Sequence, residues 1–282
     1  MKKTILSLAL LILAGGATAQ TDKAAAKAAA KALKEAKKEA KTQMDEALKV
    51  KDAIYLKVQD KEKPATAEEV FTECKKGLDL INKALASGHI EEKKLGEGYK
   101  LCADLATLPH NLYLEAASQK QPLDTANYYN NLKVLTDALH NELKYTEKKT
   151  GETGNVKYLE GKQASLAKSA VYYIYAAQFE GDCKRFDSAL EAYDIALNYG
   201  KRYPIVAEQV ELSVEPNQIA YYAFQTAYQA KKYKEMVAEK LPLKALYLYG
   251  SYSKGNHRED SDIDIAVVVD HLSDNYFEDT PL

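Results

Sequence analysis

Residues 170–201 carry the main signal of the fold class and read AVYYIYAAQFEGDCKRFDSALEAYDIALNYGK. Its alanines and tyrosines recur three and four residues apart, the spacing that places side chains on one face of a helix. A short polar run, EGDCKR, interrupts this spacing near the middle. The stretch therefore predicts two packed helices joined by a tight turn.

This predicted helix pair resembles the tetratricopeptide repeat, a helix–turn–helix of about 34 residues. Tyr173 stands where that family prefers a large aromatic residue, and Ala177 stands where it prefers a small one. The second-helix pattern is matched by Phe186, Ala189, Tyr193 and Ala196. A second, partial match covers residues 220–236. The resemblance implies a repeat array whose concave surface holds a peptide or protein partner; a generic helical bundle is the alternative.

Helical spacing extends through residues 64–238, where the sequence predicts no strand. Pro64 ends the preceding segment, and Thr66 with Glu69 has the chemistry of a capping box that starts a helix running to Ser87-Gly88. Because proline disrupts helices, Pro109 is expected to stop the next one. Further helices are predicted at 91–108, 110–119, 124–147 and 162–180. The fold is thus predicted to be mainly α, a helical-repeat array.

Residues 20–63 form a separate segment rich in Ala, Lys and Glu. This composition favours a helix with little to bury, and apolar residues become frequent only from Met44 onward. The basic first half could indicate a membrane or nucleic-acid surface. A solvated helix with Glu–Lys pairs is the favoured interpretation, because no aromatic anchors face the lysines.

The overall composition is balanced, with 39 basic and 41 acidic side chains and a formal charge of −2. No global positive field favours nucleic acid, so no nucleic-acid partner is predicted. The chain has 21 tyrosines, no tryptophan and three cysteines, Cys74, Cys102 and Cys183. These cysteines lack metal-ligand spacing, and buried free thiols are favoured over a disulfide.

The first 19 residues have the pattern of a secretory signal peptide. Lys2 and Lys3 form a basic start, an apolar stretch follows, and Ala17-Thr18-Ala19 is an A-x-A cleavage site. The apolar stretch is short for a transmembrane helix, although an uncleaved anchor is the alternative. We therefore expect export to the periplasm or the cell exterior, with no membrane span after cleavage.

Residues 239–282 change in character. The segment 246–269 reads LYLYGSYSKGNHREDSDIDIAVVV: an apolar run, a Gly-Ser turn, a polar loop and a second apolar run that opens on two aspartates. Alternate residues of a strand share a face, so Asp262 and Asp264 would project together. Paired carboxylates suit Mg²⁺, and a Gly-Ser turn at Gly250-Ser251 offers donors to phosphate.

Residues 246–269 resemble the nucleotidyltransferase superfamily, close to its minimal members and more distantly to the polymerase-beta-like enzymes. The shared pattern is a strand, Gly-Ser, about ten residues and Asp-x-Asp on the next strand. The resemblance implies transfer of a nucleoside monophosphate from Mg-NTP to an unidentified acceptor. Asp262 and Asp264 would be catalytic and hold Mg²⁺, and the phosphates would be bound by Gly250, Ser251, Lys254 and Arg258. Surface solvation is an equally good explanation of Lys254 and Arg258.

The superfamily also uses a third carboxylate on an adjacent strand, and the sequence offers no clear candidate. Asp270 lies six residues beyond Asp264 along the same strand, roughly 20 Å away. Residues 239–282 are therefore expected to form a short, incomplete α/β segment, and its enzymatic activity is left open. A cytosolic type of enzyme also conflicts with export, so a fusion, a gene remnant or a junction of two reading frames is hypothesised. The alternative function is a non-catalytic exported scaffold with a vestigial tail.

Overall fold

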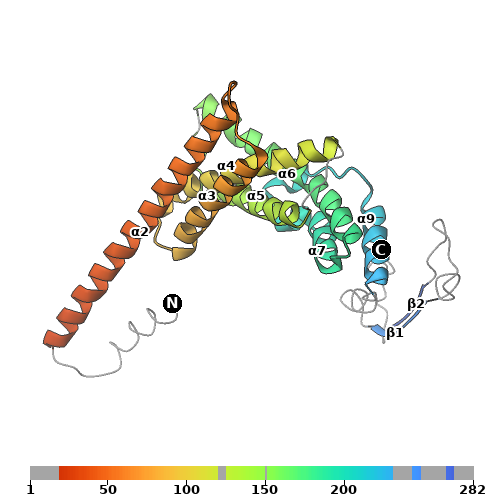
Figure 1. Cartoon of the computed structure of the whole chain (residues 1–282). Helices are drawn as coiled ribbons and strands as arrows, with labels where there is room; N and C mark the ends of the chain where they lie inside the picture. Colours follow the sequence, from red (N-terminus) through yellow and green to blue (C-terminus); the bar gives the residue numbers. More distant parts are fainter. Residues whose placement is uncertain (1–18, 120–124, 150, 231–242, 249–264, 270–282) are drawn as a thin grey trace. The chain divides into compact units, whose positions relative to one another are not determined.

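A computed structural model describes residues 19–119, 125–149, 151–230, 243–248 and 265–269 (Figure 1). The described chain is mainly helical, as predicted. It divides into two compact units, Met1–Gln121 with Val134–Val156 and Pro122–Lys133 with Lys157–Leu282. The predicted domain boundaries at 19/20, 63/64 and 238/239 remain predictions.

The first unit is built on three helices and a short 3₁₀ turn. These are α2 (Ala19–Gln59), α3 (Ala67–Ser87), η1 (Glu92–Lys94) and α4 (Leu95–Ser118), joined by the end of α5 (Thr125–Tyr145). Helices α2 and α3 pack side by side (Figure 1). The buried residues of α2 are Ala40, Ala47 and Ile54, seven apart, which is the spacing of a coiled-coil seam. Before Ala36 the described side chains of α2 are exposed, as expected for its Ala/Lys/Glu-rich start.

Local sequence signals set the ends of α3. The Thr66 hydroxyl accepts a hydrogen bond from the Glu69 amide (3.2 Å), and the Glu69 carboxylate accepts one from the Thr66 amide (2.9 Å). This is the predicted capping box, and the Thr66 amide holds the pKa of Glu69 below its usual value. At the other end Gly88 has φ 70°, a left-handed conformation that glycine adopts without strain.

The predicted stop at Pro109 is wrong, because α4 continues through this residue to Ser118. A proline within a helix costs about 3 kcal/mol. Buried residues lie on both sides of it, including Leu105, Ala106 and Tyr113. Packing of both halves against neighbouring helices therefore offsets the loss of one helical hydrogen bond. The separate helices expected at 91–108 and 110–119 are a single element.

The second unit contains most of α6 (Thr153–Asp182), together with α7 (Phe186–Leu197), α8 (Tyr199–Arg202), η2 (Pro204–Gln209) and α9 (Pro216–Gln229). Buried tyrosines form much of its core. The ring of Tyr199 lies 6.0 Å from that of Tyr173 and 4.8 Å from that of Tyr203, and its hydroxyl donates to the Leu166 carbonyl. Tyrosine thus supplies large apolar area while its hydroxyl remains hydrogen-bonded.

The buried carboxylate of Glu180 stabilises the turn between α6 and α7. Glu180 accepts two hydrogen bonds from the Arg185 guanidinium, at 2.6 and 2.9 Å, and the Arg185 amide donates to the Glu180 carbonyl. Between them Lys184 has φ 60°. Bidentate pairing of this kind satisfies a carboxylate that would otherwise be costly to bury.

The helix pair predicted in residues 170–201 is present as α6, a three-residue turn and α7. Its pattern positions Tyr173, Ala177, Ala189, Tyr193 and Ala196 are buried, and Phe186 is half-buried. However, α6 has 30 residues, which is long for one helix of a 34-residue repeat. The repeat array remains a prediction.

Two short strands lie in the C-terminal segment, β1 (Leu243–Leu248) and β2 (Ile265–Val269). They pair antiparallel, with Leu248 opposite Ile265 and an irregularity between Leu243 and Ala245. The sequence predicts strands at both places. The residues between and after them are outside the described part of the chain, so the α/β fold of this segment stays a prediction.

Candidate functional site

The predicted nucleotidyltransferase residues all fall in one segment. Gly250, Ser251, Lys254, Arg258, Asp262 and Asp264 belong to 249–264, which lies outside the described residues. The structure describes the two strands that flank this segment, β1 and β2. Because Leu248 pairs with Ile265, the chain leaves β1 and enters β2 at the same end of the two-stranded ribbon. One residue separates Gly250 from the end of β1, and Asp264 directly precedes β2.

A second candidate site lies in the first unit, where α2, the turn after α3, and α4 enclose a hollow of about 570 Å³. Four apolar side chains line it, Met44, Leu48, Ile90 and Leu101. Ligand pockets in proteins commonly measure some 300–1,000 Å³ and are mainly apolar with a few polar groups. The hollow thus has the size and the apolar lining of a small-molecule site.

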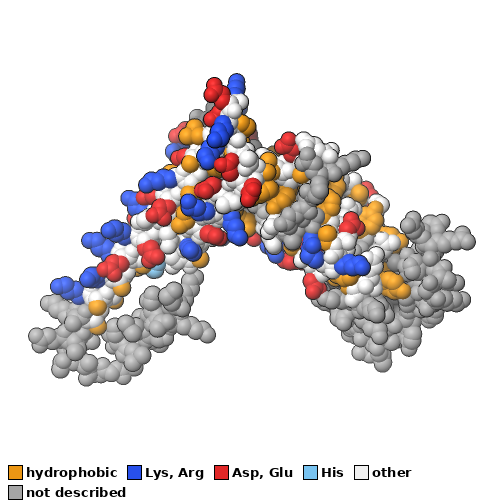
Figure 2. Space-filling model, viewed as in Figure 1, with side chains coloured by type: hydrophobic (Ala, Val, Ile, Leu, Met, Phe, Trp, Pro, Cys, Tyr) orange, Lys and Arg blue, Asp and Glu red, His pale blue; other side chains and the backbone are white. Residues whose placement is uncertain are grey.

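Charged side chains also line this hollow. Six are lysines, Lys37, Lys38, Lys41, Lys51, Lys94 and Lys100, and four are acids, Asp45, Glu91, Glu97 and Asp104. Figure 2 shows the basic and acidic side chains interspersed along the exposed face of α2. The lining has an excess of positive charge, although the whole chain is slightly acidic.

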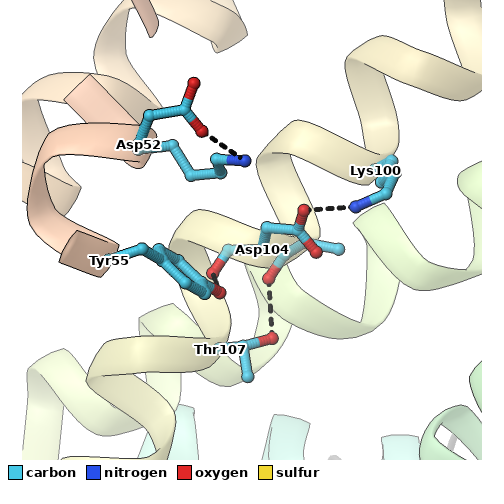
Figure 3. A network of polar contacts seen from close by, with 7 residues as sticks. Asp52, Tyr55, Lys100, Asp104 and Thr107 are labelled. Carbon is cyan, nitrogen blue, oxygen red and sulfur yellow. Dashed lines mark hydrogen bonds and ion pairs between the residues drawn. The ribbon is translucent and has the colours of Figure 1, made fainter. Parts of the chain in front are cut away.

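One wall of the hollow is held by a hydrogen bond between α2 and α4 and by an ion pair within α4 (Figure 3). The Tyr55 hydroxyl donates to the Asp104 carbonyl at 2.9 Å, and the Lys100 ammonium lies 2.5 Å from the Asp104 carboxylate. Burial, followed by the nearby Asp104 charge, raises the pKa of Tyr55 to about 12. Tyr55 therefore stays neutral and acts as a hydrogen-bond donor that positions the Asp104 turn of α4.

Carboxylates in and beside the lining are already engaged by lysines. Asp104 is paired with Lys100, and Lys93 lies 3.2 Å from Glu91. The hydrogen bond from Lys93 and then its charge lower the pKa of Glu91, with smaller effects of Lys94 and Lys37. Lys38, Lys41 and Lys94 form no ion pair within the described chain, although the charge of Lys94 acts on Glu91. An anion in the hollow can meet all three ammonium groups.

The sequence does not predict the hollow. Its residues come from 37–51 and 89–104, which share no motif and meet only because α2 and α4 converge. One signal was present: Leu48 is 45% exposed, although its neighbours Ala47 and Val50 face the core side of the helix. Exposed apolar residues mark sites when they lie together in a concave surface.

The cysteines behave as structural residues. Cys74, Cys102 and Cys183 form no disulfide; the first two are buried free thiols as predicted, whereas the prediction is wrong for Cys183, which is exposed. Burial raises the pKa of Cys74 and of Cys102 to about 12, so neither thiol is a nucleophile near neutral pH. Among the described residues no group of three or more His, Cys, Asp or Glu side chains is arranged to hold a metal ion.

No helix in the described part of the chain combines the length and the apolar character needed to cross a bilayer. The predicted signal peptide lies almost wholly in residues 1–18, which are outside the description.

Comparison with known proteins gives one match. The family model of the nucleotidyltransferase domain matches residues 230–280, which include both strands and the whole of 249–264. This match supports a nucleotidyltransferase-type module in the C-terminal segment. No curated protein and no solved structure matches the chain. The tetratricopeptide resemblance has no support from a family model.

Proposed function

We propose that residues 239–282 act as a nucleotidyltransferase-type module that binds Mg-NTP and transfers its nucleoside monophosphate to an acceptor. The observation that carries the proposal is the family match over 230–280, at the residues where the sequence pattern was found. The pairing of Leu248 with Ile265 supports it, because that register would bring both motifs to one end of the ribbon.

Each predicted residue has a defined role in this proposal. Asp262 and Asp264 would hold Mg²⁺, which would activate the attacking oxygen of the acceptor and stabilise the charge on the leaving pyrophosphate. Gly250 and Ser251 bind the outer phosphates through the backbone amide and the hydroxyl. Lys254 and Arg258 offset phosphate charge. Nucleotide binding needs the aspartate pair, whereas transfer also needs a further carboxylate to complete the metal site.

Binding and transfer are tested separately on the full chain. Binding of each of the four NTPs is measured by calorimetry with and without Mg²⁺, and transfer is followed as pyrophosphate release. We expect Mg²⁺-dependent binding of at least one NTP that is lost in Asp262→Asn and in Asp264→Asn. Asp270→Asn is the matched control, because it makes the same change in the same segment outside the motif.

The results distinguish three cases. Binding with pyrophosphate release establishes an active transferase, and binding alone establishes a nucleotide-binding module. No binding at millimolar NTP, or equal loss in Asp262→Asn and Asp270→Asn, contradicts the proposal.

A second candidate function is an exported helical scaffold for a peptide or protein partner. It is favoured by the burial of the predicted repeat positions in α6 and α7, and by the packing of α7 against α9. In this alternative the C-terminal segment is dispensable for partner binding. Cleavage of the signal peptide is tested by mass spectrometry of the protein recovered from its native host: a mature chain that starts at Gln20 supports it, and a retained Met1 contradicts it.

A further inference from the structure

The hollow between α2 and α4 combines two features that neither the helical scaffold nor the nucleotidyltransferase proposal explains. Its floor is apolar, with Met44, Leu48, Ile90 and Leu101, and Leu48 is held 45% exposed. Leaving a leucine in water forgoes part of the roughly 1.5–3 kcal/mol that its burial would contribute. An apolar group that covers this floor would recover that free energy.

The charged side chains that line the hollow determine which charge such a group carries. Six lysines and four carboxylates line the hollow, and two of those carboxylates are already bound by Lys100 and Lys93. Lys38 and Lys41 on α2 and Lys94 at the end of η1 form no ion pair in the described chain. Asp45 and Glu97 also line the hollow, but its lysines outnumber its carboxylates by six to four, so an acidic group is attracted there more strongly than a cation.

We propose that this hollow binds a small amphiphilic organic acid. The acidic group lies among Lys38, Lys41 and Lys94, and the apolar body covers Leu48 and its neighbours. A simple inorganic anion would leave the floor uncovered, and a neutral apolar molecule would leave the lysines unused. The volume of about 570 Å³ suits a ligand of this size.

The proposal is tested by calorimetry with the full chain and three probes. Decanoate has both features, acetate lacks the apolar body, and decyltrimethylammonium has the opposite charge. We expect saturable binding of decanoate in the micromolar to millimolar range and no saturable binding of the other two. Equal binding of decanoate and decyltrimethylammonium would overturn the assigned charge selectivity, and no binding of decanoate would overturn the site.

Paired variants locate the binding on α2. The change Lys38→Glu with Lys41→Glu is expected to weaken decanoate binding roughly tenfold, because two exposed charge contacts are reversed. Its control is Lys27→Glu with Lys31→Glu, which alters the net charge equally on the same helix outside the hollow. Leu48→Ser should weaken binding about fivefold, and Leu33→Ser, equally exposed on the same helix, should not.

Two further results would overturn the proposal. If the control variants weaken binding as much as the variants in the hollow, the ligand is attracted by general surface charge. If the chain sediments with anionic lipid vesicles but does not bind free decanoate, the lysines serve a membrane surface. In either case the nucleotide test is unaffected, because it concerns a different segment.

Discussion

At the scale of single residues, the most informative titratable group is His110. It lies in the middle of α4 and is 5% exposed. Burial lowers its pKa from 6.5 to about 4. A histidine in this state is neutral in the folded chain but is protonated near pH 6.5 once the chain unfolds.

This predicts a specific acid sensitivity. Between pH 6.5 and pH 4 the unfolded chain binds a proton that the folded chain does not, so stability is retained above 6.5 and falls as the pH drops. The loss attributable to His110 should reach up to about 3 kcal/mol. Urea unfolding of the wild type and of His110→Gln at pH 7 and pH 4.5 measures it.

The variant separates His110 from the other groups that titrate in this range. His110→Gln should lose less stability on acidification than the wild type, whatever its stability at pH 7. Equal losses in the two proteins would show that His110 does not determine the pH dependence.

At the scale of secondary-structure elements, glycines mark where helices approach closely. Gly96, in the first turn of α4, lies against the end of α5. A Cβ placed there would be 2.8 Å from the Thr146 hydroxyl oxygen and 3.0 Å from the Tyr145 carbonyl oxygen. The carbonyl belongs to the backbone and cannot rotate away, so the contact requires glycine.

We expect Gly96→Ala to destabilise the protein by about 1–3 kcal/mol, since the added methyl overpacks this contact. Gly161→Ala is the matched control. Gly161 is exposed within α6 with nothing within 4 Å of an added Cβ, so alanine should stabilise by about 0.5–1 kcal/mol. Thermal unfolding of both variants tests the pair, and a shift of the same sign in both would contradict the packing argument.

Helix positions were largely predictable because their signals are local. Thr66 and Glu69 cap α3 by hydrogen bonds that span three residues, and Gly88 ends it by its own conformation. The exception is Pro109, where burial of neighbours distant in sequence overrides a local breaker. The hollow could not be predicted for the same reason, because its two walls are about 50 residues apart in the chain.

At the scale of the whole molecule, the described helices and strands differ in the contacts they make. The helices pack on other helices, and β1 and β2 contact each other. We expect a chain of residues 20–238 to keep the helical content and the cooperative melting of the helical part, because its buried residues lie between Ala40 and Ala227. Circular dichroism of this fragment checks the prediction, and an unfolded fragment would contradict it.

The fragment also distinguishes the two proposals on ligands. It should retain decanoate binding, since the hollow lies within residues 37–104, and it should lose nucleotide binding, since 249–264 are removed. Retained nucleotide binding would mean that the aspartate pair is not the nucleotide site.

The sequence by itself determined the mainly helical character, the capped ends of α3 and the nucleotidyltransferase pattern that the family match supports. These depend on spacing and side-chain chemistry within a few residues. The tertiary structure alone decided that α4 passes through Pro109, that Tyr199 packs on Tyr173, and that lysines of α2 and α4 surround one apolar floor. Each depends on residues far apart in the chain, whose proximity is set by packing free energy that no local pattern encodes.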